Sequence, residues 1–190
     1  MALVKTVLLI DGENLVFRYQ SMLQNGRIPK KGNVHIQDVF IWNPEVAKIF
    51  TVDLFRAVYY TSLVGDHLLI DSTKDQISRN IVNTDISGAG NFYGKCQLVP
   101  FVFKKEKRTD KSRLVDIFLA VDGMKYANNN NIECIAFLSG DSDFIKPYDE
   151  IMSLGKKVYV GAFSDGLGKN ISNKVDMFYD LDEIFFEKKN

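Results

Sequence analysis

Cysteine and histidine are scarce in this sequence, which has two residues of each among 190. Cys96 and Cys134 are not spaced as a C-x-x-C pair, so we expect neither a disulfide framework nor a structural zinc site. This pattern favours a reducing compartment, and we expect the protein in the cytoplasm. Any metal site must then be built from carboxylates, which prefer hard ions such as Mg²⁺ or Mn²⁺.

Long hydrophobic runs and a net charge are also missing. No apolar segment has the length of a membrane span, so no membrane partner is expected. The apolar residues 1–10 lead straight into Asp11-Gly12, with no small-residue cleavage site, and are predicted to form a strand rather than a signal peptide. The 24 basic and 24 acidic residues cancel, whereas a strongly basic nucleic-acid-binding protein would carry an excess of lysine and arginine.

Apolar runs that alternate with helical patterns predict an α/β protein. The predicted strands include Lys5–Ile10, Leu54–Leu63, Cys96–Phe103, Glu133–Leu138 and Lys157–Phe163. The segment 112–127 has the apolar stripe of a helix, whereas residues 26–43 are mostly polar and are predicted to be a loop. We therefore expect a Rossmann-like three-layer fold, with a mostly parallel central sheet flanked by helices. A single domain over residues 1–190 is expected, with an excursion around residues 26–94.

Two acidic motifs directly follow predicted strands. The first is Asp11-Gly12-Glu13-Asn14, and the second is Ser139-Gly140-Asp141-Ser142-Asp143. In a doubly wound sheet, functional groups gather beyond the carboxyl ends of the strands, so both motifs are expected at one edge. An aspartate after a strand is often only a helix cap, but two dense clusters at the same edge are harder to explain in this way.

Asp116 is the third acidic element. It lies in the first turn or so of the predicted helix 112–127, where the helix dipole favours a carboxylate. Asp122 follows six residues later, about 240° further round the helix, so both cannot point into one crevice. We therefore favour Asp116 as a candidate metal ligand at this edge, and we assign Asp122 a supporting or structural role.

Carboxylates that crowd together repel one another unless a cation neutralises them. The four aspartates Asp11, Asp116, Asp141 and Asp143 therefore suggest a divalent-metal site, whose natural chemistry is phosphodiester hydrolysis. Asn14, Ser139 and Ser142 could orient ligands, water or a phosphate, although helix capping and turn formation explain them equally well. In the capping interpretation, Asn14 is the N-cap of the first helix.

A dense basic run follows the Cys96–Phe103 strand. Its members are Lys104, Lys105, Lys107, Arg108, Lys111 and Arg113, opposed only by Glu106 and Asp110. Such a run is ordinarily a solvated loop, and the alternative is a patch that contacts RNA phosphates beside the acidic site. Tyr59, Tyr60, Phe92 and Tyr93 could stack on unpaired bases, although core packing is the usual role of aromatic side chains.

Three strings carry a resemblance to a known family. VLLIDGENL, KSRLVDIFLAVD and IAFLSGDSDFIKPYDEIMSLGKKVYVGAF are similar to the NYN family of PIN-like nucleases, in its bacterial LabA-like branch. The resemblance implies a PIN-like fold and cleavage of single-stranded or structured RNA that depends on Mg²⁺ or Mn²⁺. It also implies Asp11, Asp116, Asp141 and Asp143 as the acidic set, with Asn14 beside it. Leu114 departs from the pattern, since many relatives have a small residue there.

Two functions are therefore open. The first is a metal-dependent endoribonuclease. The second is a regulatory module that keeps the fold and binds RNA or protein without turnover, because a fold does not by itself imply a function.

Overall fold

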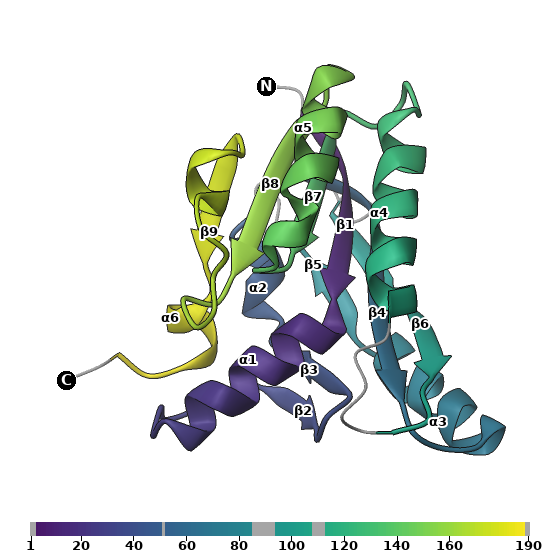
Figure 1. Ribbon diagram of the computed structural model, residues 1–190, viewed down its shortest axis with the longest axis vertical. Coiled ribbons are helices and arrows are strands. Elements are labelled where there is room, and N and C mark those ends of the chain that lie inside the picture. Colours follow the sequence, from purple (N-terminus) through teal and green to yellow (C-terminus); the bar gives the residue numbers. More distant parts are fainter. Residues whose placement is uncertain (1–2, 51, 85–93, 108–112, 189–190) are drawn as a thin grey trace.

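A seven-stranded sheet forms the centre of the computed structural model, which describes residues 3–50, 52–84, 94–107 and 113–188 (Figure 1). Its strands are β1 (Lys5–Asp11), β4 (Asp53–Leu63), β5 (Ile81–Asn83), β6 (Lys95–Lys104), β7 (Cys134–Leu138), β8 (Lys157–Ala162) and β9 (Met177–Asp180). The helices are α1 (Gly12–Gln24), α2 (Glu45–Lys48), α3 (His67–Ser78), α4 (Arg113–Ala127), α5 (Ile145–Ser153) and α6 (Asp182–Phe185), with 3₁₀ turns η1 (Ser142–Phe144) and η2 (Ile171–Asn173). Among the described residues, no helix is long and apolar enough to cross a membrane.

The strand order places β1 at the middle of the sheet. The order is β5-β6-β4-β1-β7-β8-β9, and only the pairing of β5 with β6 is antiparallel. From β1 the chain builds β4 and β6 on one side, then returns to build β7, β8 and β9 on the other. The order therefore reverses between β1 and β7, and the loops after these two strands leave the same edge of the sheet. The predicted α/β fold, with a mostly parallel sheet between helices, is confirmed.

Alternate side chains of β1 enter two separate cores. Leu8 and Ile10 pack with α1, while Val7 and Leu9 pack against α4 and α5, which lie on the opposite face (Figure 1). Asp11 continues the Val7–Leu9 row and so belongs to the face that α4 and α5 cover. The alternation of the strand thereby directs the first acidic residue toward the helix that carries Asp116.

The predicted loop of residues 26–43 contains a β-hairpin, so that prediction is wrong. Strand β2 (Val34–Ile36) pairs antiparallel with β3 (Phe40–Trp42). The three apolar residues of β3 are at most 1% exposed, and the backbone N–H of Ile41 donates to the Tyr59 hydroxyl at 3.1 Å. A three-residue apolar run is too short for its periodicity to predict a strand, and only packing on α1 and β4 stabilises it here.

The strand β6 contains Pro100, for which the sequence predicts an edge position or a bulge. Strand β5 pairs only with Lys95–Gln97, whereas β4 pairs with β6 from Leu98 to Lys104. Within the described ranges, Pro100 therefore has a neighbouring strand, β4, on one side only. At such an edge position, a residue without an N–H leaves no neighbouring strand without a hydrogen bond. The edge prediction for this residue is confirmed.

The turn from β1 into α1 requires glycine at position 12. A Cβ on Gly12 would meet Tyr59 Cε1 at 2.2 Å and the carbonyl oxygen of Tyr60 at 2.7 Å. We expect Gly12→Ala to lower the free energy of unfolding by about 1–3 kcal/mol, because the buried tyrosine cannot move aside. Urea denaturation measures this loss. Gly140→Ala is the control, since its Cβ would lie 3.5 Å from Ala162 Cβ, and equal losses in both variants would contradict the prediction.

Candidate functional site

Asp11 is the last residue of β1 and the N-cap of α1. Its Oδ1 accepts the backbone N–H of Asn14 at 3.0 Å, and its Oδ2 accepts the Ser139 hydroxyl at 2.9 Å. The prediction that Asn14 caps this helix is therefore wrong. The helix begins at Gly12, two residues earlier than the predicted cap, so Asp11 stands where the free N–H groups of the first turn can reach its carboxylate.

Asn14 connects the two strand-end loops. Its side-chain oxygen accepts the backbone N–H of Gly140 at 3.0 Å, while the Ser139 hydroxyl accepts the backbone N–H of Asp141 at 3.2 Å. Together with the bond from Ser139 to Asp11, these contacts hold the ends of β1 and β7 in one fixed arrangement. Asp11 and Ser139 are 128 residues apart in the sequence. Their two motifs nevertheless lie at the same edge of the sheet.

Asp141 begins the turn η1 in the same way that Asp11 begins α1. Its Oδ1 accepts the backbone N–H of Asp143 at 3.0 Å. Asp141 is half-buried, whereas Ser142 and Asp143 are exposed. The second motif therefore has one inward carboxylate at the edge and one carboxylate that faces solvent beside it.

Asp116 and Asp122 leave α4 in different directions, as their spacing predicts. The negative charge of Asp116, in the first turn of the helix, contributes to raising the pKa of Asp11, so the two carboxylates interact. Asp122 instead accepts the Tyr60 hydroxyl at 2.6 Å and lies 3.7 Å from the Lys125 ammonium. Asp122 thus fastens α4 to β4 and does not join the acidic set.

The Asp11 carboxyl is only 2% exposed, and its surroundings favour the neutral form. The pKa of this carboxyl is raised to about 7, with burial as the largest cause and the charges of Asp116 and Glu13 acting in the same direction. The N–H of Asn14 and the hydroxyl of Ser139 act in the opposite direction but do not cancel the burial. At neutral pH a proton or a cation therefore stabilises this site.

Glu13 is a member of the site that the sequence interpretation did not single out. Its carboxylate accepts the Ser62 hydroxyl and lies 3.4 Å from the Lys105 ammonium, and both charged side chains are 13% exposed. The only signal in the sequence was its position within the Asp11–Asn14 motif. The pairing could not be predicted, because Lys105 follows β6, two strands away from β1.

The predicted basic run divides into several parts. Lys105 is paired with Glu13 at the acidic edge, whereas Lys104, Lys107 and Arg113 are exposed. Arg108 and Lys111 lie outside the described residues. The two tyrosines that were candidates for base stacking, Tyr59 and Tyr60, are both fully buried, and the candidates Phe92 and Tyr93 also lie outside the described residues.

Tyr148 places a buried hydroxyl near the same edge. It lies in the first turn of α5, packs on Phe137 with ring centroids 4.9 Å apart, and is 0% exposed. Among the described residues, its hydroxyl has no hydrogen-bond partner. Burial raises its pKa well above the ordinary value, and the charges of Asp11 and Asp141 raise it further, so the hydroxyl lies within electrostatic reach of both carboxylates.

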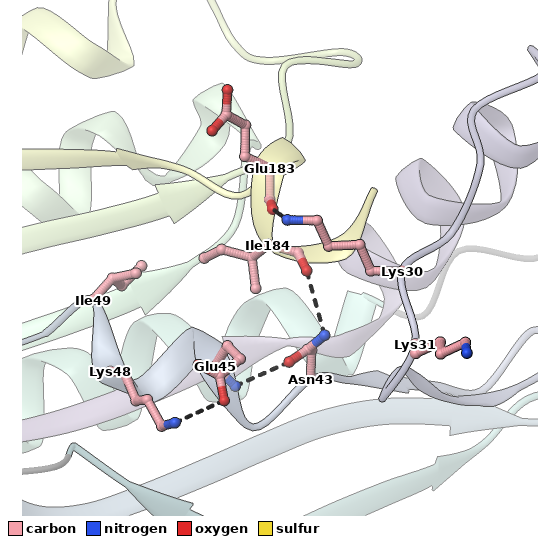
Figure 2. Close-up of a pocket in the computed structure, with 8 residues that line it drawn as sticks. All are labelled: Lys30, Lys31, Asn43, Glu45, Lys48, Ile49, Glu183 and Ile184. Atoms are coloured by element: carbon pink, nitrogen blue, oxygen red, sulfur yellow. Dashed lines mark hydrogen bonds and ion pairs between the residues drawn. The ribbon is translucent and has the colours of Figure 1, made fainter. Parts of the chain in front are cut away.

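The surface cavity shown in Figure 2 is separate from this site. It has a volume of about 370 Å³ and is lined by Lys30, Lys31, Asn43, Glu45, Lys48, Ile49, Glu183 and Ile184, none of which belongs to the acidic set. Two of the lysines that line it are paired with other groups of the same chain. Lys48 is 2.7 Å from Glu45, and Lys30 donates to the carbonyl oxygen of Glu183.

Comparison with known proteins identifies the family. The model of the NYN domain matches residues 5–182, which include both acidic motifs and all the strands of the central sheet. The chain belongs to the NYN domain family. A solved structure of a protein of unknown function from Vibrio parahaemolyticus is similar, with a TM-score of 0.59 and 17% identity over 97% of each chain, which shows the shared fold alone. No curated protein matches the chain.

The donors of this NYN domain suit a hard divalent cation. Asp11, Asp116 and Asp141 supply carboxylate oxygens at one edge, and the raised pKa of Asp11 means that a cation would relieve the local repulsion. Across the part of the chain that the structure describes, no group of three or more His, Cys, Asp or Glu residues is placed to hold a metal ion, so the carboxylates form an open site. Mg²⁺ fits such an open site, because it usually keeps several waters and takes only one or two protein carboxylates.

The raised pKa of Asp11 predicts how the stability of the NYN domain depends on pH. The carboxyl has a pKa of about 7 in the folded chain and about 3.9 when unfolded. Between these pH values the carboxyl is ionised in the unfolded chain but still protonated in the folded one. The free energy of unfolding therefore falls by on the order of 4 kcal/mol as the pH rises from 4 through 7.

Denaturation in EDTA from pH 4 to pH 8 measures this loss. We expect the wild type to lose stability steadily relative to Asp11→Asn, which has no carboxyl to titrate. Asp75→Asn, an exposed change on α3, should keep the wild-type slope. Parallel pH profiles for the wild type and Asp11→Asn would contradict the assignment.

The unpartnered hydroxyl of Tyr148 predicts a stabilising substitution. A buried hydroxyl without a partner costs about 1–3 kcal/mol, so Tyr148→Phe should raise the melting temperature in the absence of metal. The matched control is Tyr59→Phe, because the Tyr59 hydroxyl is buried and bonded to the backbone of Ile41, so this variant should be destabilised. Equal destabilisation of both variants would show that Tyr148 has a partner in the apo protein.

Proposed function

We propose that this NYN domain is a metal-dependent endoribonuclease that hydrolyses RNA phosphodiester bonds at the edge formed by β1, β7 and the start of α4. The observation that carries the proposal is the buried Asp11 carboxyl, whose pKa is raised to about 7 beside Asp116 and Glu13. A carboxyl held in this unfavourable state at the switch point of a doubly wound sheet is typical of a functional site. The membership of the family supports ribonuclease activity.

The aspartates differ in their roles within this proposal. Asp11, Asp116 and Asp141 hold the cation, since all three lie at the edge and are wholly or partly buried. Asp143 is exposed next to Asp141 and either binds the cation or accepts a proton from the attacking water. When bound, Mg²⁺ or Mn²⁺ lowers the pKa of a water and stabilises the charge that develops on the phosphate.

The neutral side chains orient the acidic ones. Ser139 and Asn14 fix the two strand-end loops through their bonds to Asp11 and Gly140, which keeps the carboxylates in register. Ser142 is exposed and is available to a substrate phosphate. The buried Tyr148 hydroxyl lies within electrostatic reach of Asp11 and Asp141.

The cations around the edge suit an RNA strand. Lys105 lies beside Glu13 at the acidic site, and the exposed Lys104, Lys107 and Arg113 extend the positive charge outward. Such side chains neutralise phosphates and make binding salt-dependent. Their placement supports RNA as the substrate, with the acidic set acting on a phosphate that the lysines hold.

The open donor set also supports a second candidate, a regulatory module that binds RNA or protein without turnover. Among the described residues, no group of three or more His, Cys, Asp or Glu is placed to hold a metal ion, which favours this alternative. Calorimetry with Mn²⁺ separates the two. No heat of binding at millimolar Mn²⁺ would favour the module, whereas binding that Asp11→Asn abolishes would favour the nuclease.

The cellular setting and the branch of the family are parts of the same proposal. Both cysteines are free, and burial raises the thiol pKa of Cys96 to about 11 and of Cys134 to about 12, so neither acts as a thiolate nucleophile. Free thiols fit a reducing cytoplasm. The motif strings around Asp11 and Asp141 support membership of the LabA-like branch.

The nuclease proposal predicts cleavage of single-stranded RNA that Mn²⁺ stimulates and EDTA abolishes. Asp11→Asn combined with Asp141→Asn should lower the rate about 100-fold or more, because the cation contributes several kcal/mol to transition-state stabilisation. Gel analysis of a labelled RNA measures the rate. Asp75→Asn, on the exposed side of α3, should cleave at the wild-type rate. Undiminished cleavage by the folded double variant would overturn the proposal.

A further inference from the structure

A row of three side chains leads across the sheet away from the acidic site. Asp11 of β1 pairs with Tyr60 of β4, and Tyr60 pairs with Phe101 of β6. All three lie on the face that α4 covers, because Tyr60 bonds to Asp122 of that helix and its ring stacks on Phe101 with centroids 5.4 Å apart. At about 4.8 Å per strand, Phe101 is roughly 10 Å from Asp11 across the sheet.

Phe101 belongs to an aromatic platform, which we define as Phe101, Phe103 and Phe118. The ring of Phe118 lies 6.2 Å from that of Phe101 and 4.9 Å from that of Phe103. Helix α3 covers the opposite face of β6, where Leu98 and Val102 are buried, but Phe101 and Phe118 remain 37% and 38% exposed. Two aromatic rings are thus presented to solvent between β6 and α4. These two elements lie next to each other in Figure 1.

The platform continues along the outer side of α4. Leu114, Ile117 and Val121 are exposed and, with Phe118, follow the i, i+3, i+4, i+7 spacing of one helical face. This face is normally polar on a surface helix, whereas the inner face of α4 buries Val115 and Leu119 in the core. An exposed apolar helix face marks an interaction surface.

Positive charge adjoins the platform at its end nearest the acidic site. Lys104 and Lys107 follow Phe103 closely in the chain, Arg113 precedes Leu114, and all three are exposed. The one exposed acidic residue within this stretch of the described chain is Glu106. Rings flanked by ammonium and guanidinium groups are the arrangement that binds single-stranded nucleic acid, with bases on the rings and phosphates on the cations.

We propose that the aromatic platform stacks the unpaired bases of a single-stranded RNA next to the phosphate at the acidic site. This proposal rests on the proposed function and names the surface that holds the bases of its substrate. Stacking needs bases that are free of a duplex, so the platform selects single-stranded RNA over double-stranded RNA. The row from Asp11 through the buried Tyr60 to Phe101 sets the separation between the acidic site and the exposed rings at roughly 10 Å, about two strand spacings.

A second copy of the chain is the competing occupant, because the stripe on α4 would also pack against an apolar surface. The rings and the adjoining cations favour RNA, since neither is needed by a purely apolar contact between helices. The two occupants give different results. If the stripe is a dimer interface, the molecular mass in solution should double as the protein concentration rises. Phe118→Ala should then restore the monomer mass and leave the affinity for RNA unchanged.

The test measures binding of a short labelled single-stranded RNA by fluorescence anisotropy in EDTA, where cleavage does not occur. Phe101→Ala with Phe118→Ala should weaken binding about 10-fold or more. Phe55→Ala is the control, because Phe55 is 49% exposed near the start of β4, away from the acidic edge, and should bind as the wild type does. Binding of an RNA duplex should be weaker and much less sensitive to the double variant.

Two milder variants keep the test decisive if the double variant does not fold. Phe118→Tyr retains an aromatic ring and should keep the affinity, whereas Phe118→Leu retains only apolar volume and should lose several-fold. Equal affinities for these two folded variants would overturn stacking. So would wild-type affinity in a folded double variant, or a concentration-dependent dimer that Phe118→Ala disrupts without any change in RNA binding.

Failure of the platform and failure of the nuclease proposal are distinguishable. If the wild type binds RNA through the rings but never cleaves it with Mn²⁺, the platform stands and the nuclease proposal fails. If the wild type cleaves RNA and the platform variants bind it equally well, the nuclease proposal stands and the platform fails. A wild type that binds no single-stranded RNA overturns the platform outright.

Discussion

Two hydrogen bonds between the chain segments at the ends of β1 and β7 are the constraint on which the rest of the site depends. The Ser139 hydroxyl donates to Asp11, and the Gly140 N–H donates to the side chain of Asn14, so two loops far apart in sequence are held as one edge. Every other element of the site is placed relative to this edge. Helix α4 begins beside it, and the turn η1 starts within it. These two bonds extend the pairing of β1 with β7, which ends at Ile10 and Leu138, into the two motifs.

The same edge holds a carboxyl group whose ionised form is electrostatically unfavourable. Asp11 is buried, and the negative charges of Asp116 and Glu13 oppose its ionisation, while only neutral donors support it. Packing offsets this penalty, because the residues that precede Asp11 in β1 are almost fully buried between two helical layers. A stable sheet can therefore carry an unfavourable carboxyl at its end, where a cation or a proton relieves it. This is the usual relation between a rigid scaffold and a strained functional site.

Helix α4 serves both the core and the surface. Its inner face closes the core over β1 and β4, its first turn presents Asp116 to the edge, and Asp122 fastens it to Tyr60. Its outer face is apolar where a surface helix is ordinarily polar, and it adjoins the rings on β6. The acidic edge and this apolar face thus meet at the start of α4, where Asp116 and Leu114 lie in the same turn. The departure at Leu114 from the small residue of many relatives falls on this outer face.

The sequence by itself determined the buried strands, the two acidic motifs at their ends and the family, because strand runs and strand-end motifs are local patterns. The divergence of Asp116 and Asp122 also followed from helical geometry alone. Only the tertiary structure decided that Asp11 caps the first helix, that Glu13 pairs with Lys105 and that the Tyr148 hydroxyl is buried near the carboxylates. These contacts join strands and helices far apart in the chain, and no periodicity encodes such pairings. The hairpin of residues 34–42 escaped prediction for the same reason, since three-residue strands are stabilised by packing and not by their own pattern.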